Sequence, residues 1–113
     1  MEIIKKAVIA FNGRSEEVEA IIDTGAEQTM IDEEVLLRIG APHMYNRRVE
    51  SMGEFKDLKP VYPADIEIDG YGFPLVVLGG KKNLIGHDFL QKAKAVINEA
   101  TGEVKFTKNY IEM

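Results

Sequence analysis

One stretch of the sequence decides the fold: residues 20–31, which read Ala-Ile-Ile-Asp-Thr-Gly-Ala-Glu-Gln-Thr-Met-Ile. Two isoleucines lead into Asp23 and a glycine-containing turn, and a further apolar pair, Met30-Ile31, follows closely. Apolar residues on both sides predict burial of Asp23. A carboxylate is seldom buried unless it is paired, because removing its charge from water costs several kcal/mol. The pattern therefore indicates that this aspartate has a chemical use.

The stretch resembles the active-site motif of retroviral-type (retropepsin-like) aspartic proteases. In that family an apolar pair precedes Asp-Thr-Gly-Ala, and an acidic residue, a variable residue, Thr and an apolar residue follow. A second stretch, Leu84-Ile-Gly-His-Asp-Phe-Leu90, resembles the family's second element, in which a strand ends at a glycine beside the Asp-bearing loop and a short helix begins. The resemblance covers roughly residues 18–106. It implies an all-β fold, a single-domain acid-protease half-barrel over residues 1–113 with one or two short helices.

Peptide hydrolysis by this route needs two carboxylates that share one proton, one to activate water and one to protonate or polarise the scissile carbonyl. Asp-Thr-Gly occurs once in the chain. Either the site is incomplete or a second copy of the chain completes it. A chain of 113 residues forms one domain with a modest core, which favours a homodimer with the two Asp23 residues facing each other across a two-fold axis.

The resemblance also implies the roles of individual residues. Asp23 supplies the carboxylate, the Thr24 hydroxyl braces the loop, and Gly25 lets a substrate or partner backbone approach because it has no side chain. A peptide or protein substrate would bind as an extended strand between the protomers. The expected substrate-binding residues are Ala26, Glu27, Met52, Gly53, Leu84 and Ile85. Met52 and Gly53 lie at the tip of a hairpin predicted within residues 47–62, which is either a flap over the peptide or a plain surface hairpin.

Other segments carry ordinary structural signals. A hairpin is expected over residues 2–22 with its turn at Asn12-Gly13, and a short helix over residues 32–40 with Asp32 as N-cap and Gly40 at its end. Asp65, Glu67 and Asp69 imitate the start of a calcium loop. The twelfth position of that loop is Val76, so they are read as the exposed face of a strand that turns near Gly70. A turn is expected at residues 79–82 and a hairpin over residues 93–106 that turns at Thr101-Gly102. The resemblance implies that the tail, 107–113, joins the dimer sheet.

Composition narrows the class of protein. A net charge of −5 and a pI near 5.0 exclude a basic nucleic-acid footprint. The chain has no cysteine and two distant histidines, so we expect no disulfide, metal or cofactor. No signal-peptide pattern is present and no apolar run approaches the ~20 residues that span a membrane. We therefore expect no membrane partner and a cytoplasmic location.

Two points stay open at this stage. Retroviral enzymes often place Arg after the second-motif glycine, paired with the acid two residues past the first-motif glycine. Here those positions hold His87 and Glu27, so the pair would be pH-dependent, or His87 is simply a polar residue at a helix start. The leading hypothesis is a homodimeric aspartic endopeptidase. The alternatives are a protease-like module for dimerisation or peptide binding with little turnover, and an unrelated β-rich domain.

Overall fold

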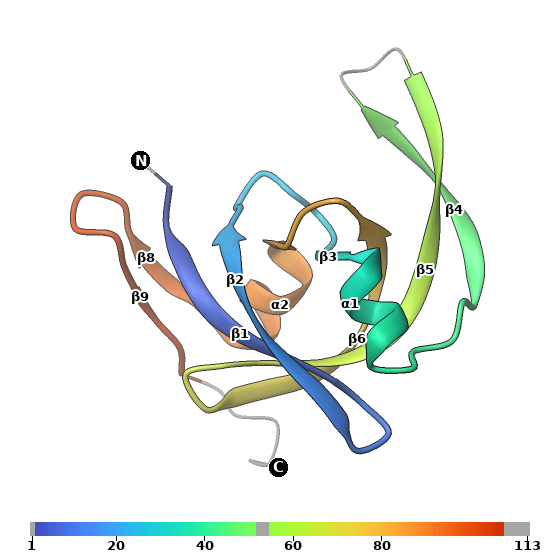
Figure 1. Cartoon of the computed structure of the whole chain (residues 1–113). Helices are drawn as coiled ribbons and strands as arrows, with labels where there is room; N and C mark the ends of the chain where they lie inside the picture. Colours follow the sequence, from blue (N-terminus) through green and yellow to red (C-terminus); the bar gives the residue numbers. More distant parts are fainter. Residues whose placement is uncertain (1, 52–54, 108–113) are drawn as a thin grey trace.

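A computed structural model describes residues 2–51 and 55–107 of the chain, and its first element is the expected hairpin (Figure 1). Strands β1 (Ile4–Phe11) and β2 (Arg14–Ile22) pair antiparallel along their whole length. Asn12 and Gly13 join them with φ of 50° and 84°. Positive φ at both central residues matches the twist of the flanking strands, which explains why Asn-Gly is found here.

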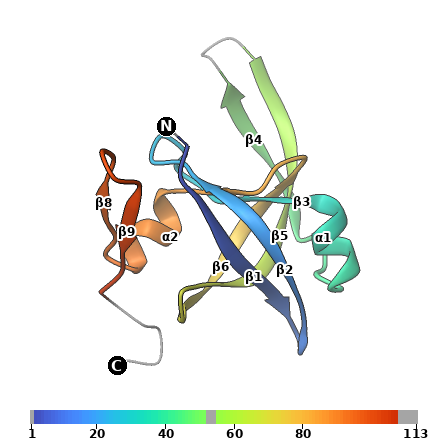
Figure 2. The ribbon, with the colours of Figure 1, turned by 60° about the vertical axis from the view of Figure 1, so that its left-hand side comes forward.

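A seven-stranded sheet closes part of the way into a barrel. Its order is β1-β2-β7-β3-β6-β5-β4, and β1 also pairs with β5, so that the sheet curls back on itself (Figures 1 and 2). The remaining strands of this sheet are β3 (Met30–Asp32), β4 (Tyr45–Ser51), β5 (Phe55–Ile68), β6 (Tyr71–Gly80) and β7 (Leu84–Ile85). The expected all-β half-barrel is confirmed.

Two short helices and a second hairpin complete the described part of the chain. Helix α1 (Glu33–Arg38) begins where the Asp32 side chain accepts a 2.9 Å hydrogen bond from the backbone N–H of Glu34, and it is followed by Gly40 at φ 80°. Helix α2 (His87–Lys92) follows β7, and strands β8 (Val96–Asn98) and β9 (Glu103–Lys105) form the expected hairpin. Within residues 2–51 and 55–107 no helix is long and apolar enough to cross a membrane.

The core lies inside the curled sheet and under α2. Phe89 of α2 is fully buried and meets Phe73 and Phe106 edge to face, with ring centroids 5.4 and 5.8 Å apart. Strand β5 alternates as predicted, because Ile66 and Ile68 are buried whereas Asp65 and Glu67 are exposed. The packing of Phe89 anchors α2 on the core and so fixes the position of β7 and Gly86, which precede the helix.

The prediction of a turn at residues 79–82 is wrong for residues 79 and 80. Gly79 and Gly80 are the last two residues of β6 and pair with Ile31 and Asp32 of β3. A Cβ atom at Gly79 would lie 2.7 Å from the ring of Tyr62, and one at Gly80 would overlap the sulfur of Met30. Close packing across the sheet, and not turn geometry, therefore favours glycine at these two positions.

Candidate active site

The loop that carries Asp23 is held between three strands. Ile21 and Ile22 at the end of β2 pair parallel with Leu84 and Ile85 of β7, and the backbone N–H of Asp23 donates a 2.9 Å hydrogen bond to the carbonyl of Ile85. On its other edge Leu84 pairs with Met30, where the loop enters β3. The strand before Gly86 therefore runs beside the Asp-bearing loop, as the resemblance implies.

The two motifs meet directly through their backbones at Gly86. A Cβ atom on Gly86 would lie 2.8–2.9 Å from backbone atoms of Gln28 and Ala26. The next two residues continue the contact: the N–H of His87 donates to the carbonyl of Ala26 at 2.7 Å, and that of Asp88 donates to the carbonyl of Glu27 at 3.2 Å. Glycine is needed here because backbone atoms occupy the space that a side chain would take.

A buried threonine, Thr29, locks the loop, and the sequence reasoning did not single it out. Its hydroxyl donates a 2.6 Å hydrogen bond to Asp88 Oδ1 and accepts one of 3.0 Å from the N–H of Gly86. Its own N–H donates to both carboxylate oxygens of Asp88 at 3.0 Å. The sequence feature that could have identified Thr29 is its place as a hydroxyl residue directly before the apolar pair Met30-Ile31. Thr24, the residue expected to brace the loop, is exposed and makes no side-chain hydrogen bond within the described part of this chain.

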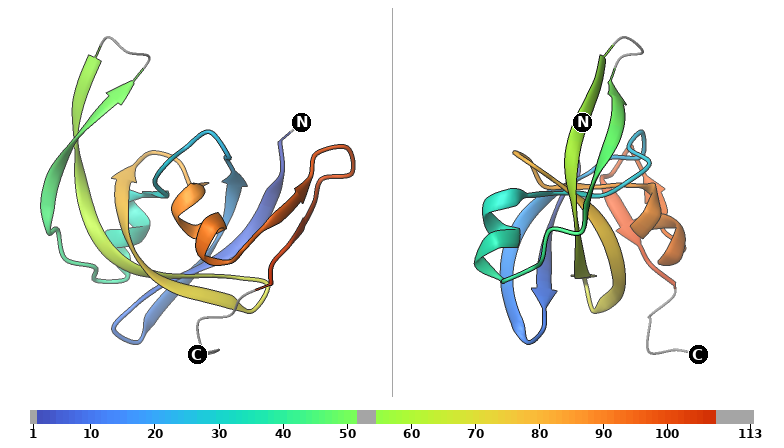
Figure 3. Two further views of the ribbon diagram at one scale, coloured as in Figure 1. Left: turned by 180° about the vertical axis from the view of Figure 1, so that it is seen from behind. Right: turned by 90° about the vertical axis from the view of Figure 1, so that its right-hand side faces the viewer.

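Asp23 itself is half-buried at the open end of the molecule. Its Oδ1 accepts a 3.0 Å hydrogen bond from the N–H of Gly25, and among the described residues no second carboxylate is hydrogen-bonded to it. It borders a hollow of about 230 Å³ that is also lined by Ile3, Ile22, Thr24, Ile97 and Glu99. The N-terminal end of β1, the loop after β2 and the tip of the β8–β9 hairpin all lie at this end (Figures 1 and 3).

A larger cleft of about 710 Å³ lies beside the same loop. Its walls are Gly25, Ala26, Glu27, Gln28, Met30, Arg47, Arg48, Val49, Leu78 and Leu84. Ala26, Glu27 and Leu84, three of the residues expected to bind substrate, line this cleft. Ile85 does not: its side chain is fully buried in the core, because neighbouring residues of a strand face opposite sides, and its carbonyl holds Asp23 instead. Met52 and Gly53 lie outside the described residues.

His87 and Glu27 are not joined in this chain. Both are exposed, and the part of the chain that the structure describes contains no hydrogen bond or ion pair between their side chains. His87 is the first residue of α2, and its contact with the loop is made by its backbone N–H. The described residues also contain no cluster of three or more His, Asp and Glu side chains that could hold a metal ion.

Comparisons with known proteins agree with this geometry. Residues 7–92 match the family described as "gag-polyprotein putative aspartyl protease". The DNA damage-inducible protein 1 of Yarrowia lipolytica is 30% identical over an alignment of 97 residues. The match covers 79% of this chain and 24% of that protein, so the chain spans about a quarter of this relative's length. The solved structure of EIAV protease complexed with the inhibitor HBY-793 has the same fold, with a TM-score of 0.67 and 17% identity over 87% of this chain and 93% of that one.

Proposed function

The chain belongs to the gag-polyprotein aspartyl protease family, and on that basis we propose that it is an aspartic endopeptidase that works as a homodimer. The observation that carries the proposal is the state of Asp23. Its carboxylate is oriented by the Gly25 N–H, stands at the open end of the fold, and has no second carboxylate bonded to it among the described residues. A second copy of the chain would supply the missing acid.

In the proposed mechanism two Asp23 carboxylates share one proton. Two carboxyl groups close enough to share a proton do not both ionise, because their negative charges repel, so one group stays protonated. The ionised group takes a proton from a water molecule, and the protonated group polarises the scissile carbonyl. Thr24 is exposed next to Asp23, a position from which its hydroxyl would bond across the two-fold axis. The backbone N–H of Gly25 donates a hydrogen bond to the Asp23 carboxylate and orients it.

Apolar residues around the Asp23 hollow support association at this end. Ile4 is 54% exposed and Val96 64% exposed, and they neighbour Ile3 and Ile97, which line the hollow. Removing such side chains from water favours association by about 25 cal/mol per Å² of apolar surface. An interface formed over the hollow, which would bury Ile3 and Ile97, would also bring each Asp23 toward its copy, as an isologous contact requires.

The proposed substrate is an extended peptide that lies in the larger cleft. Ala26, Glu27 and Leu84 would contact it from the body of the protein, and Val49 from β4. Met52 and Gly53, outside the described residues, stay predicted substrate contacts. Ile85 would act on substrate only through the loop that it supports. Cytoplasmic residence stays a prediction from the sequence.

Cleavage of an unstructured polypeptide tests the proposal. The wild-type chain, Asp23→Asn and the control Asp65→Asn are incubated with it over a range of pH and protein concentration; Asp65 is an exposed residue of β5. We expect pepstatin-sensitive cleavage whose rate rises more steeply than linearly with concentration, because two chains make one site. Asp23→Asn should lower the rate at least about a hundredfold, and the control should not. Binding of the polypeptide without cleavage at any pH would refute the proposed protease activity and support the alternative, a peptide-binding module. Equal cleavage by wild type and Asp23→Asn would refute the catalytic role of Asp23.

A further inference from the structure

The larger cleft contains a positive charge that its surroundings hold in place but do not neutralise. Arg47 of β4 donates through Nη1 to the side-chain oxygen of Gln28, and Gln28 Nε2 donates to the carbonyl of Val76 at 2.9 Å. Both Arg47 and Gln28 line the cleft. A chain of two hydrogen bonds therefore ties β6 to the guanidinium through the loop that follows Asp23.

The orientation of the Gln28 amide is fixed by its two partners. Its NH₂ must face the Val76 carbonyl, which accepts, and its oxygen must face the guanidinium, which donates. The partner of Arg47 is thus a neutral oxygen. No carboxylate whose side chain the structure describes lies within ion-pair distance of Arg47; that includes Glu27, the acid of the same cleft.

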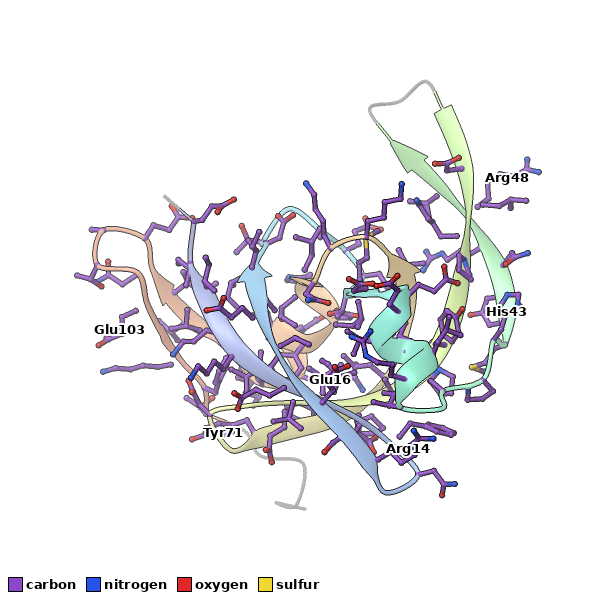
Figure 4. All side chains as sticks on the ribbon, viewed as in Figure 1. Arg14, Glu16, His43, Arg48, Tyr71 and Glu103 are labelled. Atoms are coloured by element: carbon purple, nitrogen blue, oxygen red, sulfur yellow. The ribbon has the colours of Figure 1, made fainter. Side chains whose placement is uncertain are left out.

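Among the side chains that the structure describes, no neighbouring charge forms an ion pair with Arg47. The residue directly opposite it on β5 is Lys59, which faces the same side of the hairpin. The Asp57 carboxylate on that face lies 3.9 Å from Lys59 Nζ and forms an ion pair with Lys59, not with Arg47. Arg48 also borders the cleft, but its side chain projects outward from the β4–β5 hairpin, away from the body of the protein (Figure 4). Of the two described cations that border the cleft, Arg47 is therefore the one that a bound peptide would meet.

We propose that Arg47 is a specificity-determining residue that selects peptides with an acidic side chain, Asp or Glu, at the position that lies against it. The guanidinium has five donors, and the bond to Gln28 uses one, which leaves a fork that matches a carboxylate. The inference rests on the proposed function for its site. In a symmetric dimer two copies of Arg47 would flank the scissile bond, so the preference is expected on both sides of it.

Matched peptides test this selectivity. One cleaved sequence is varied by placing Glu or Gln at each position in turn, and kcat/KM is compared within each pair. Because Arg47 is exposed to solvent, we expect about a two- to fivefold preference for Glu at one position on each side. The preference should shrink as salt is added.

Three variants locate the preference. Arg47→Gln should abolish it, and Gln28→Glu should reduce it because a carboxylate would then neutralise the guanidinium. Arg14→Gln, which removes the same charge at the far end of β2 (Figure 4), should leave it unchanged. A preference that survives Arg47→Gln, or equal rates for Glu and Gln at every position, overturns the inference.

Failure of the inference is separable from failure of the proposed function. The same peptide pairs are measured for binding to the Asp23→Asn protein, which needs no turnover. The Glu peptide is expected to bind more tightly than the Gln peptide when Arg47 is present and equally tightly when Arg47→Gln is added. If it does so and the native chain fails to cleave either peptide, the selectivity of Arg47 is retained and the proposed protease activity is refuted. Cleavage without any Glu preference would do the reverse.

Discussion

The hydroxyl of Thr29 donates a 2.6 Å hydrogen bond to the carboxylate of Asp88, and so joins the loop that carries Asp23 to the first turn of α2. The two residues are 59 positions apart in the sequence. The N–H of Gly86 donates to the same hydroxyl. One buried oxygen of the first motif thus satisfies two groups of the second, and the geometry of the loop depends on it.

Thr29→Val should lower the free energy of unfolding by about 2–4 kcal/mol. Valine has nearly the same shape but leaves the Gly86 N–H without its acceptor and removes a hydrogen bond to a charged group. Denaturant unfolding measures this change in free energy. We also expect the variant to lose more proteolytic activity than its unfolded fraction accounts for, because the Asp23 loop shifts.

The matched control is Thr107→Val. Its hydroxyl makes a 3.3 Å hydrogen bond to the carbonyl of Lys94, but Thr107 is exposed, so water replaces the bond. The control should change stability by less than about 0.5 kcal/mol. Equal losses of unfolding free energy in the two variants would show that the Thr29–Asp88 contact stabilises the protein no more than an exposed hydrogen bond does.

Gly86→Ala should destabilise the protein by about 2–3 kcal/mol through overlap alone. Gly86 has φ −96°, which any residue adopts, but its Cβ would press on backbone atoms of Ala26 and Gln28 that cannot rotate away. Gly13→Ala makes the opposite comparison, because Gly13 has φ 84° and open space around it, so the change costs only the ~1 kcal/mol of a left-handed alanine. Thermal unfolding of both variants measures the difference, and a smaller loss at Gly86 than at Gly13 would argue against the close approach.

Much of the fold could be predicted because its signals are local. The Asn12-Gly13 turn, the Asp32 cap and the Gly40 stop each depend on residues within one turn of the chain, and the structure contains all three. The approach of Gly86 to the Asp23 loop is not local, and it was expected only because two motifs in order resemble one family.

The errors come from long-range packing. Gly79-Gly80-Lys81-Lys82 has the composition of a turn, but the positions of the glycines are set by Tyr62 and Met30, which the sequence does not place nearby. Similarly, Leu84 and Ile85 look alike in sequence. Only the register of β7 between β2 and β3 decides that one lines the cleft and the other enters the core.

That division between Leu84 and Ile85 is itself testable. Ile85→Ala should cost about 2–5 kcal/mol of stability because it empties a fully buried site. Leu84→Ala should cost less, under about 1.5 kcal/mol, since Leu84 is only half-buried, and should instead raise KM for peptides. Chemical denaturation and steady-state kinetics on both variants separate the two effects. A larger stability loss at Leu84 than at Ile85 would contradict the register.

Stability at high pH should depend on Tyr62. Its hydroxyl donates a 2.5 Å hydrogen bond to Glu33 Oε2, and burial, assisted by that carboxylate, raises the pKa of Tyr62 from 10.0 to about 12. The folded protein therefore keeps this proton at a pH where the unfolded chain has lost it. The resulting stabilisation is complete below pH 10 and is lost as the pH rises through about 12. Tyr62→Phe should flatten the fall in unfolding free energy over this interval, and the exposed Tyr45→Phe should not. Identical pH profiles for wild type and Tyr62→Phe would mean that the phenol ionises equally easily in both states.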